Sequence, residues 1–306
     1  MSASNQSYLT RARARAIGLP LTDLRGPLYT RLYHDTYVPS ADVGTLQVTA
    51  ATAMSRLPQA HHVSHHTAVR LWGGVAPDSA DVHVSMTTRE ERCRRSGVAA
   101  HLAGAGVRVT TRYGLAISTP VQAFLDLASV GVSLVELVIA GDSLVKAAKL
   151  DRIALVEAAD EWRGRHAKQA RRAARLVRQG VDSPMETRLR LLLVLAGLPE
   201  PDVNFILRAP DGSWRRRFDL CYPGARLIIE YDGRQHAFDH EQWSNDLARR
   251  EELDGLRWRL VVIESDGVYA DPLRTLERVR DALAERGVRV PRVFRAEWTR
   301  HFVAYR

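Results

Sequence analysis

The sequence predicts an α/β protein, and three observations support this fold class. Residues 181–306 alternate between helical and strand-like patterns, which predicts a mixed sheet flanked by helices. Residues 1–132 combine short strand-like and helical pieces, which indicates an α+β domain, and residues 133–180 have the apolar spacing of helices. Because 306 residues are about twice the usual domain size, we expect two domains joined by this helical connector.

The first 180 residues carry modest signals for individual elements. Short strands are expected at 32–33, 37–38, 82–84 and 107–109. In the connector, apolar residues recur at helical spacing after residue 133, and a second helical run covers 151–179. Gly180 is expected to close that second helix as a C-terminal cap.

The C-terminal region has a clearer order of elements. Ser183 is a good N-cap, Pro184 suits a first helical turn, and Gly197 ends the predicted helix. The other predicted elements are strands at 215–221, 226–232 and 258–264 and helices at 239–254 and 272–285. The segment 222–225 predicts a type II turn between the first two strands, which then form a hairpin.

Acidic residues gather on this predicted hairpin. With the turn centred on residues 223–224, Asp219 lies opposite Ile228, and Glu230 is its diagonal neighbour on the same face. Asp232 shares that face because strand side chains alternate. Two carboxylates about 5 Å apart repel by roughly 3 kcal/mol at an effective dielectric constant near 20, and a bound Mg²⁺ or Mn²⁺ would remove this repulsion. The alternative is a solvated strand face, against which the apolar Ile228 argues.

The order and spacing of these residues resemble a known enzyme family. Phe218-Asp219-Leu220 is followed by Ile229-Glu230-Tyr231-Asp232-Gly233, then by His236, Asp246, Arg249 and Leu253. Residues 183 to about 286 thereby resemble an endonuclease-like family related to the very-short-patch-repair (Vsr) endonucleases of the PD-(D/E)xK superfamily. The resemblance implies a restriction-endonuclease-like mixed sheet flanked by helices, and a magnesium-dependent enzyme that hydrolyses phosphodiester bonds of DNA.

The resemblance also implies roles for individual residues. Asp219 and Glu230 would be the metal-binding pair, and Glu186 would be the helix-borne acid that often completes the site. Asp232 and His236 would continue the family's E-x-D-G-x-x-H pattern. A supporting D-x-x-R pattern would be formed by Asp246 and Arg249.

Several of these residues have a simpler interpretation. Glu186 completes a Ser-x-x-Glu capping box, which alone explains it. His236 follows a Gly as loop-surface residues do, and Asp246 with Arg249 has the spacing of a helix ion pair. Asp232 stands where the superfamily has Lys, and residues 181–306 contain no Lys, so His236 or a second metal would have to activate water.

The charge balance favours a polyanionic partner, with nucleic acid first and a membrane surface second. The chain has a net charge of +9, with 44 basic against 35 acidic residues. Only three of the basic residues are Lys, and a GC-rich genome would explain such an Arg preference. Arg171, Arg175 and Arg178 lie on a basic segment of the connector, which predicts DNA phosphate contacts or, alternatively, a solvated helix face.

The N-terminal region resembles a second family. Segments 32–39, 63–73 and 119–128 are similar to AbiEi-type antitoxin and regulator domains, although the winged-helix segment expected at the start is short. The histidines at 61, 62, 65 and 66 have spacing that a zinc site can use, but no nearby Cys or carboxylate completes four ligands. Ser64 is better explained as the N-cap of a helix.

The sequence leaves two classes of function in competition. Without an 18-residue apolar run or a signal peptide, and with two distant Cys, it predicts a cytoplasmic protein with no membrane segment. The first class is a DNA endonuclease, which the acids favour. The second is a weakly active or inactive DNA-binding regulator on the same fold, which the missing Lys favours. A purely structural domain explains neither the net charge nor the acids.

Overall fold

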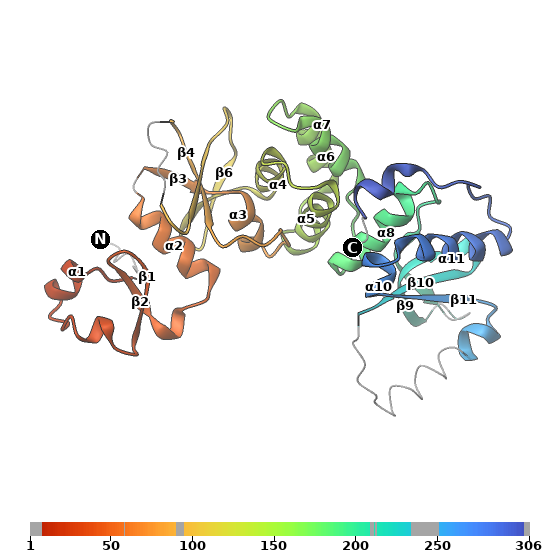
Figure 1. Ribbon diagram of the computed structural model, residues 1–306, viewed down its shortest axis with the longest axis horizontal. Coiled ribbons are helices and arrows are strands. Elements are labelled where there is room, and N and C mark those ends of the chain that lie inside the picture. The colour runs from red at the N-terminus through yellow and green to blue at the C-terminus, as the bar shows by residue number, and fades with distance from the viewer. Residues whose placement is uncertain are drawn as a thin grey trace. The chain divides into compact units, whose positions relative to one another are not determined.

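The computed structural model divides the chain into two compact units (Figure 1). It describes residues 8–57, 59–89, 95–208, 211, 213–233 and 251–302. Unit 1 comprises residues 1–132 and 147–172, and unit 2 comprises residues 133–146 and 173–306. The segment predicted as a helical connector, residues 133–180, is thus divided between the two units.

Unit 1 contains a two-stranded and a five-stranded sheet. Its strands are β1 (Tyr29–Tyr33), β2 (Thr36–Pro39), β3 (Ala60–Val63), β4 (Val82–Met86), β5 (Val98–Leu102), β6 (Val109–Arg112) and β7 (Leu115–Ser118). Its helices are α1 (Arg11–Ala16), α2 (Leu46–Arg56), α3 (His65–Leu71), α4 (Pro120–Ser129) and α6 (Arg152–Glu161). The larger sheet has the order β5-β4-β3-β7-β6 and is mixed. Three of the four expected strand positions fall in β1, β2 and β4, and the fourth meets β6 only at Val109.

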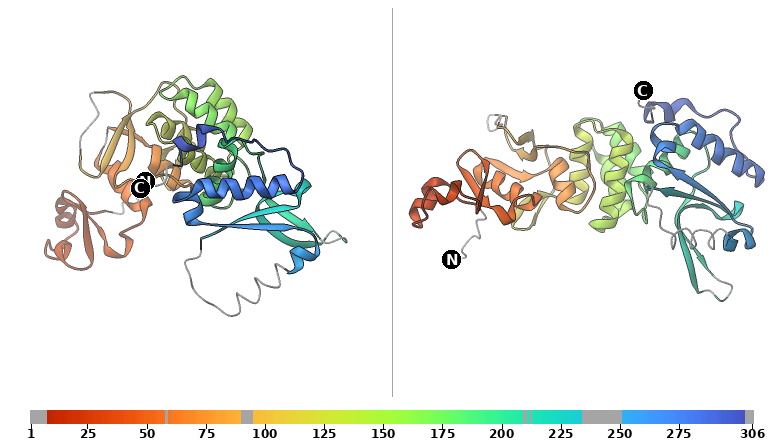
Figure 2. Two further views of the ribbon diagram at one scale, coloured as in Figure 1. Left: turned by 45° about the vertical axis from the view of Figure 1, so that its right-hand side comes forward. Right: turned by 60° about the horizontal axis from the view of Figure 1, so that its bottom comes forward.

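Unit 2 is built on a four-stranded mixed sheet. Its strands are β8 (Asp202–Arg208), β9 (Trp214–Tyr222), β10 (Leu227–Asp232) and β11 (Arg259–Glu264). Its helices are α5 (Leu134–Ala147), α8 (Pro184–Leu195), α10 (Ser265–Tyr269) and α11 (Pro272–Glu285). The order is β11-β10-β9-β8, with β10 parallel to β11 and the other pairs antiparallel. Helices α8 and α11 pack together on this sheet (Figure 2).

The α/β prediction with a mixed sheet flanked by helices is confirmed. The predicted helix at 272–285 matches α11, and the strand predicted at 226–232 is β10, which lies between β9 and β11. Residues 251–255 are helical, as the prediction of a helix ending near Gly255 requires, and the rest of that helix lies outside the described residues. Strand β8 and helix α10 were not predicted from the sequence.

The connector differs from its prediction. The run at 151–179 is two helices, α6 and α7 (Ala167–Leu176), separated by an interruption that includes Gly164 and the left-handed His166. Helix α7 ends at Leu176 rather than next to Gly180, which has a φ of +90° beyond the helix. The Asp142 carboxylate accepts the backbone N–H of Arg178 at 2.7 Å. This side chain thus supplies a hydrogen-bond acceptor to the backbone just after the end of α7. In the described chain, no helix is long and apolar enough to cross a membrane.

Candidate functional site

Helix α8 begins as the sequence predicted and presents Glu186 in its first turn. The Ser183 hydroxyl accepts the Glu186 N–H at 3.2 Å, and Pro184 occupies the first turn. The Glu186 carboxylate accepts the backbone N–H of Asp182 at 2.9 Å, one residue before the N-cap Ser183 whose N–H the predicted capping box would use. The predicted C-terminal Gly197 follows the helix with a φ of +89°.

Glu186 is also electrostatically coupled to the predicted metal pair. Its side chain is buried, with 7% relative exposure. Burial raises the pKa of the Glu186 carboxyl, the Asp182 hydrogen bond opposes that rise, and the negative charge of Asp219 adds to it. Helix α8 therefore brings Glu186 close enough to Asp219 for the two charges to repel.

The register of the hairpin differs from its prediction, but the predicted face is retained. Strands β9 and β10 pair as Leu227↔Tyr222, Ile228↔Cys221 and Ile229↔Leu220. Continued by one residue, this register sets Asp219 opposite Glu230 rather than diagonal to it. The connection is a 3₁₀ turn over Pro223–Ala225 followed by the left-handed Arg226, not a two-residue type II turn. The shift is two residues, and an even shift preserves the face of every side chain.

The structure thus brings Asp219 and Glu230 together where the β9–β10 ladder ends. Side chains directly opposite one another in antiparallel strands have Cβ atoms about 5 Å apart. Asp219 Oδ2 accepts the backbone N–H of Tyr231 at 3.1 Å, which orients the carboxylate beside β10. Asp219 and Glu230 are both half-buried, so solvent can reach them.

Asp232 lies two residues after Glu230, at the end of β10, and therefore on the same face of the strand. The parallel register pairs it with Glu264 of β11, an acid that the sequence analysis did not single out. Two acids side by side at the carboxyl ends of neighbouring parallel strands add to the negative charge of this sheet edge. The adjacent Tyr231 hydroxyl has a raised pKa because of burial first, and then because of Tyr269 and Asp232.

Part of the predicted site cannot be placed. His236, Asp246 and Arg249 lie outside the described residues. Among the described residues, no three His, Cys, Asp or Glu side chains are arranged so that they could hold a metal ion.

Two cations that the sequence analysis missed pair with Asp182, whose backbone N–H donates to Glu186. Unit 2 includes α5, so it contains Lys146 even though residues 181–306 have no Lys. Lys146 Nζ contacts Asp182 Oδ1 at 2.5 Å, and an Arg217 guanidinium nitrogen contacts Asp182 Oδ2 at 2.6 Å. Lys146 thus pairs with Asp182 from a helix outside residues 181–306, which themselves contain no Lys.

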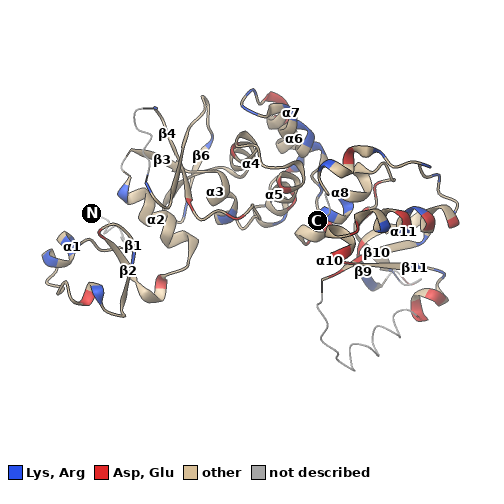
Figure 3. Ribbon diagram, viewed as in Figure 1, with Lys and Arg blue, Asp and Glu red and all other residues tan. Residues whose placement is uncertain are grey.

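The basic segment is helix α7, whose buried face is lined by alanines. Ala170, Ala173 and Ala174 are fully buried, whereas Arg175 is exposed and Arg171 is half-buried. Figure 3 shows basic residues along this helix. The exposed charges are compatible with either sequence-based interpretation, phosphate contacts or a solvated face.

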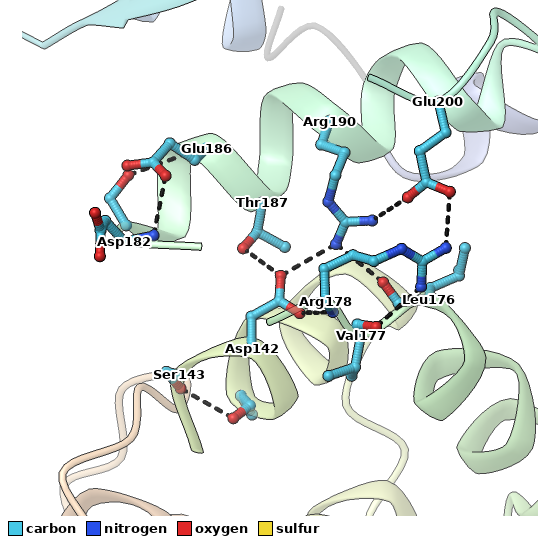
Figure 4. A network of polar contacts seen from close by, with 12 residues as sticks. Asp142, Ser143, Leu176, Val177, Arg178, Asp182, Glu186, Thr187, Arg190 and Glu200 are labelled. Carbon is cyan, nitrogen blue, oxygen red and sulfur yellow. Dashed lines mark hydrogen bonds and ion pairs between the residues drawn. The ribbon is translucent and has the colours of Figure 1, made fainter. Parts of the chain in front are cut away.

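Arg178 has an internal role beyond the end of α7 (Figure 4). Its guanidinium pairs with Glu200 at 2.7 Å and donates to the backbone carbonyls of Arg175 and Val177. Glu200 also accepts from the buried Arg190 at 2.9 Å. Arg178 is thus part of an ion network of unit 2, which no local sequence pattern predicts.

Comparison with known proteins leaves the activity open. No protein-family model matches the chain. Over 140 residues it is 29% identical to the uncharacterised proteins MT2308 and Rv2248 of Mycobacterium tuberculosis, strains CDC 1551 and H37Rv. The match covers 45% of this chain and 51% of each relative, so the chain spans about half the length of the curated relatives it matches. Because both relatives are uncharacterised, the similarity assigns no activity, substrate or partner.

Proposed function

We propose that unit 2 is a metal-dependent DNA endonuclease that hydrolyses phosphodiester bonds in the cytoplasm. The observation that carries the proposal is that acids from three separate segments are neighbours, although the described side chains are not arranged as a metal site. The β9–β10 register, continued by one residue, sets Asp219 opposite Glu230, and the charge of Asp219 adds to the rise in the Glu186 pKa that burial causes. Clustered carboxylates with perturbed pKa values are more common at functional sites than elsewhere.

The chemistry of these donors fits a hard divalent cation. Asp219 and Glu230 would hold Mg²⁺ or Mn²⁺, with Glu186 or Asp232 as a further oxygen ligand. A cation there would relieve the repulsion that raises the Glu186 pKa. When bound, the metal would stabilise the negative charge that develops on the phosphate and would lower the pKa of a water molecule. The half-buried Asp219 and Glu230 would orient the metal ion at the sheet edge.

DNA is the partner that the charge distribution favours. The chain carries a net charge of +9 while its candidate site is acidic, so the positive charge lies elsewhere on the molecule. The exposed basic residues of α7 are one place where phosphate contacts would hold DNA without base recognition.

One observation favours a second candidate, a DNA-binding regulator that cleaves weakly or not at all. Position 232 is Asp, so the usual Lys is absent from β10 and an anion takes its place. If two metal ions compensate, cleavage should depend steeply on metal concentration, and Mn²⁺ should serve better than Mg²⁺. Asp232→Asn should then weaken cleavage more than DNA binding.

A plasmid assay separates the two candidates. We expect the protein to convert supercoiled plasmid to nicked or linear DNA when Mg²⁺ or Mn²⁺ is present, and not when EDTA is present. Asp219→Asn and Glu230→Gln should each reduce the rate by on the order of 100-fold or more, because each removes a metal ligand. Asp211→Asn is the matched control, since Asp211 is exposed and bonds only to Ser213 among the described residues. Intact plasmid and intact single-stranded DNA at high protein and Mn²⁺ would leave the regulator as the better proposal.

A second experiment separates the two roles of Glu186. Glu186→Gln retains an oxygen that accepts the Asp182 N–H but removes the charge. If Glu186 binds metal, calorimetry should show weaker Mn²⁺ binding with no loss of thermal stability. Unchanged Mn²⁺ binding would leave Glu186 with the capping role alone. Asp219→Ala supplies the reference for a lost ligand.

A further inference from the structure

Lys146 and Arg217 form a cation pair held by one carboxylate. Lys146 Nζ contacts Asp182 Oδ1 at 2.5 Å and the backbone carbonyl oxygen of Asp182 at 3.2 Å. Arg217 contacts the other carboxylate oxygen at 2.6 Å. Desolvation alone would raise the Asp182 pKa, but hydrogen bonds from Lys146 and Asn204 and the charges of Arg217 and Lys146 lower it. Asp182 is therefore an anion that fixes both cations in place.

The cation pair is connected to the proposed catalytic acids through Asp182 and through strand β9. The Asp182 backbone N–H donates to Glu186 at 2.9 Å, so the residue that holds the cations also orients an acid. Arg217 is two residues before Asp219 on β9, so both side chains project from the same face, roughly 7 Å apart along the strand. The cations are thus connected to Glu186 through the Asp182 backbone and to Asp219 through strand β9.

The cation pair retains the capacity to bind an anion. The side chains of Lys146 and Arg217 are 52% and 54% exposed, although each is paired with Asp182. A guanidinium has five N–H donors, and the contact with Asp182 involves one nitrogen of Arg217. Two cations against one carboxylate leave a net positive charge. An ion pair that served only to join α5 to the segment before α8 would need Lys146 and Asp182 but not Arg217 as a second cation.

We propose that Lys146 and Arg217 form a subsite that binds a backbone phosphate of DNA beside the catalytic acids. The proposal rests on the proposed function for the identity of the substrate and names how that substrate is held. The subsite supplies positive charge that the Asp at position 232 does not. Asp182 is a positioning residue, because it orients the two cations without itself contacting the phosphate.

Binding measured without metal tests the subsite apart from cleavage. The anisotropy of a labelled DNA duplex is followed against salt concentration in EDTA. Lys146→Met and Arg217→Met should each reduce the log–log salt slope, and the double variant should reduce it by roughly 0.9, because the subsite contacts one phosphate and each phosphate contact releases counterions.

Matched controls remove the same charge close by. Lys149→Met removes an exposed Lys three residues after Lys146. Arg216→Met removes an Arg that pairs with Glu252, on the opposite face of β9 from Arg217. Both should leave the slope within about 0.3 of wild type, since neither cation borders the site. Lys146→Arg retains the charge and should retain the slope. Thermal melting verifies that each variant is folded, because loss of an exposed ion pair affects stability little.

The outcomes separate this inference from the proposed function. An unchanged slope in Lys146→Met and Arg217→Met, or an equal decrease in the controls, overturns the subsite even if the wild type cleaves plasmid. A selective decrease supports the subsite even if the wild type cleaves nothing, in which case only the endonuclease proposal fails. Absence of DNA binding by the wild type overturns both.

Discussion

Unit 1 places histidines from α3, β4 and β5 in one buried cluster, whereas unit 2 buries Arg190 between two carboxylates. Both units thus bury polar groups on folding, but unit 1 does so with side chains that can be neutral and unit 2 with full charges. The difference predicts separate vulnerabilities. Acid should charge the interior of unit 1, whereas loss of one partner should leave a buried charge in unit 2.

The histidine cluster of unit 1 is stacked and hydrogen-bonded. The rings of His65 and His101 stack with centroids 3.6 Å apart. His83 bonds through one ring nitrogen to His101 and through the other to Ser79, both at 2.9 Å. Each such bond between imidazoles requires one ring nitrogen to be an acceptor, which a protonated ring does not offer. At least one of the two rings is therefore neutral, and burial disfavours charge on His83.

The ion network of unit 2 depends on charge (Figure 4). The fully buried Arg190 donates to Asp142 at 3.1 Å, to Glu200 at 2.9 Å and to the Leu176 carbonyl at 2.9 Å. Asp142 also accepts from Thr187 at 2.8 Å. Burial raises the Asp142 pKa, and the charge of Arg190 is the leading influence that lowers it. The network connects α5, α8 and the segment after α7.

The largest effect that would test the comparison is acid destabilisation of unit 1. Desolvation lowers the pKa of His62 to about 4 and that of His83 to about 3, and charges of neighbouring groups add to both shifts. Their unfolded pKa is about 6.5, so below that pH the unfolded state binds protons that the folded state does not. Stability is therefore unaffected above pH 6.5 and falls between 6.5 and 4. These two residues alone would lower the free energy of unfolding by about 6 kcal/mol at pH 4.

Hydrogen exchange followed peptide by peptide measures this effect in each unit. Peptides from β3, β4 and β5 should lose protection as pH falls from 7 to 4, after correction for intrinsic exchange. In unit 2, Asp142 and Glu186 have raised pKa values, so protonating them does not remove stability in this range. His83→Gln should reduce the pH dependence by one proton. Equal loss of protection in both units would break the comparison.

The second test removes a charge from unit 2. Arg190→Met keeps an apolar side chain of similar length but leaves Asp142 and one oxygen of Glu200 without their guanidinium partner. We expect the free energy of unfolding of unit 2 to fall by about 3–5 kcal/mol. Arg188→Met is the matched control on the same helix, because Arg188 pairs with Glu136 and their side chains remain 20% and 26% exposed. That pair should contribute about 1 kcal/mol or less. Equal losses in the two variants would show that burial of the charge does not matter.

The sequence predicted the catalytic face better than the register. The face of a strand residue depends only on odd or even spacing, so Asp219 and Glu230 share a face although the register was wrong by two residues. The turn could not be predicted because Arg226, not Gly224, adopts the left-handed conformation. Strand β8 is a half-exposed edge strand without a strong alternating pattern, so it gave little signal.

Long-range packing explains what the sequence could not predict at the candidate site. Lys146 is 36 residues before Asp182, and only the packing of α5 within unit 2 brings them together. Arg190 and Asp142 are charged residues on helices, for which solvent exposure is the usual expectation. Their burial depends on partners from three segments, and a local sequence pattern contains no information on such partners.

The smallest predicted effect is the loss of a helix N-cap, which should lower the stability of the two units by the same amount. Ser183 caps α8 in unit 2 by accepting the Glu186 N–H at 3.2 Å, and Thr45 caps α2 in unit 1 by accepting the Val48 N–H at 3.3 Å. Ser183→Ala and Thr45→Ala should each lower the free energy of unfolding by about 1 kcal/mol, because each removes one acceptor for a helix N–H. Hydrogen exchange should localise each loss to its own unit, and the loss in Thr45→Ala should not change between pH 7 and 5, since this hydroxyl cap does not titrate there. If Ser183→Ala costs several kcal/mol while Thr45→Ala costs about 1, the start of α8 is coupled to the Arg190 network through Thr187. The polar interior of unit 2 would then extend to the candidate site, and the two units would differ in their caps as well as in their cores.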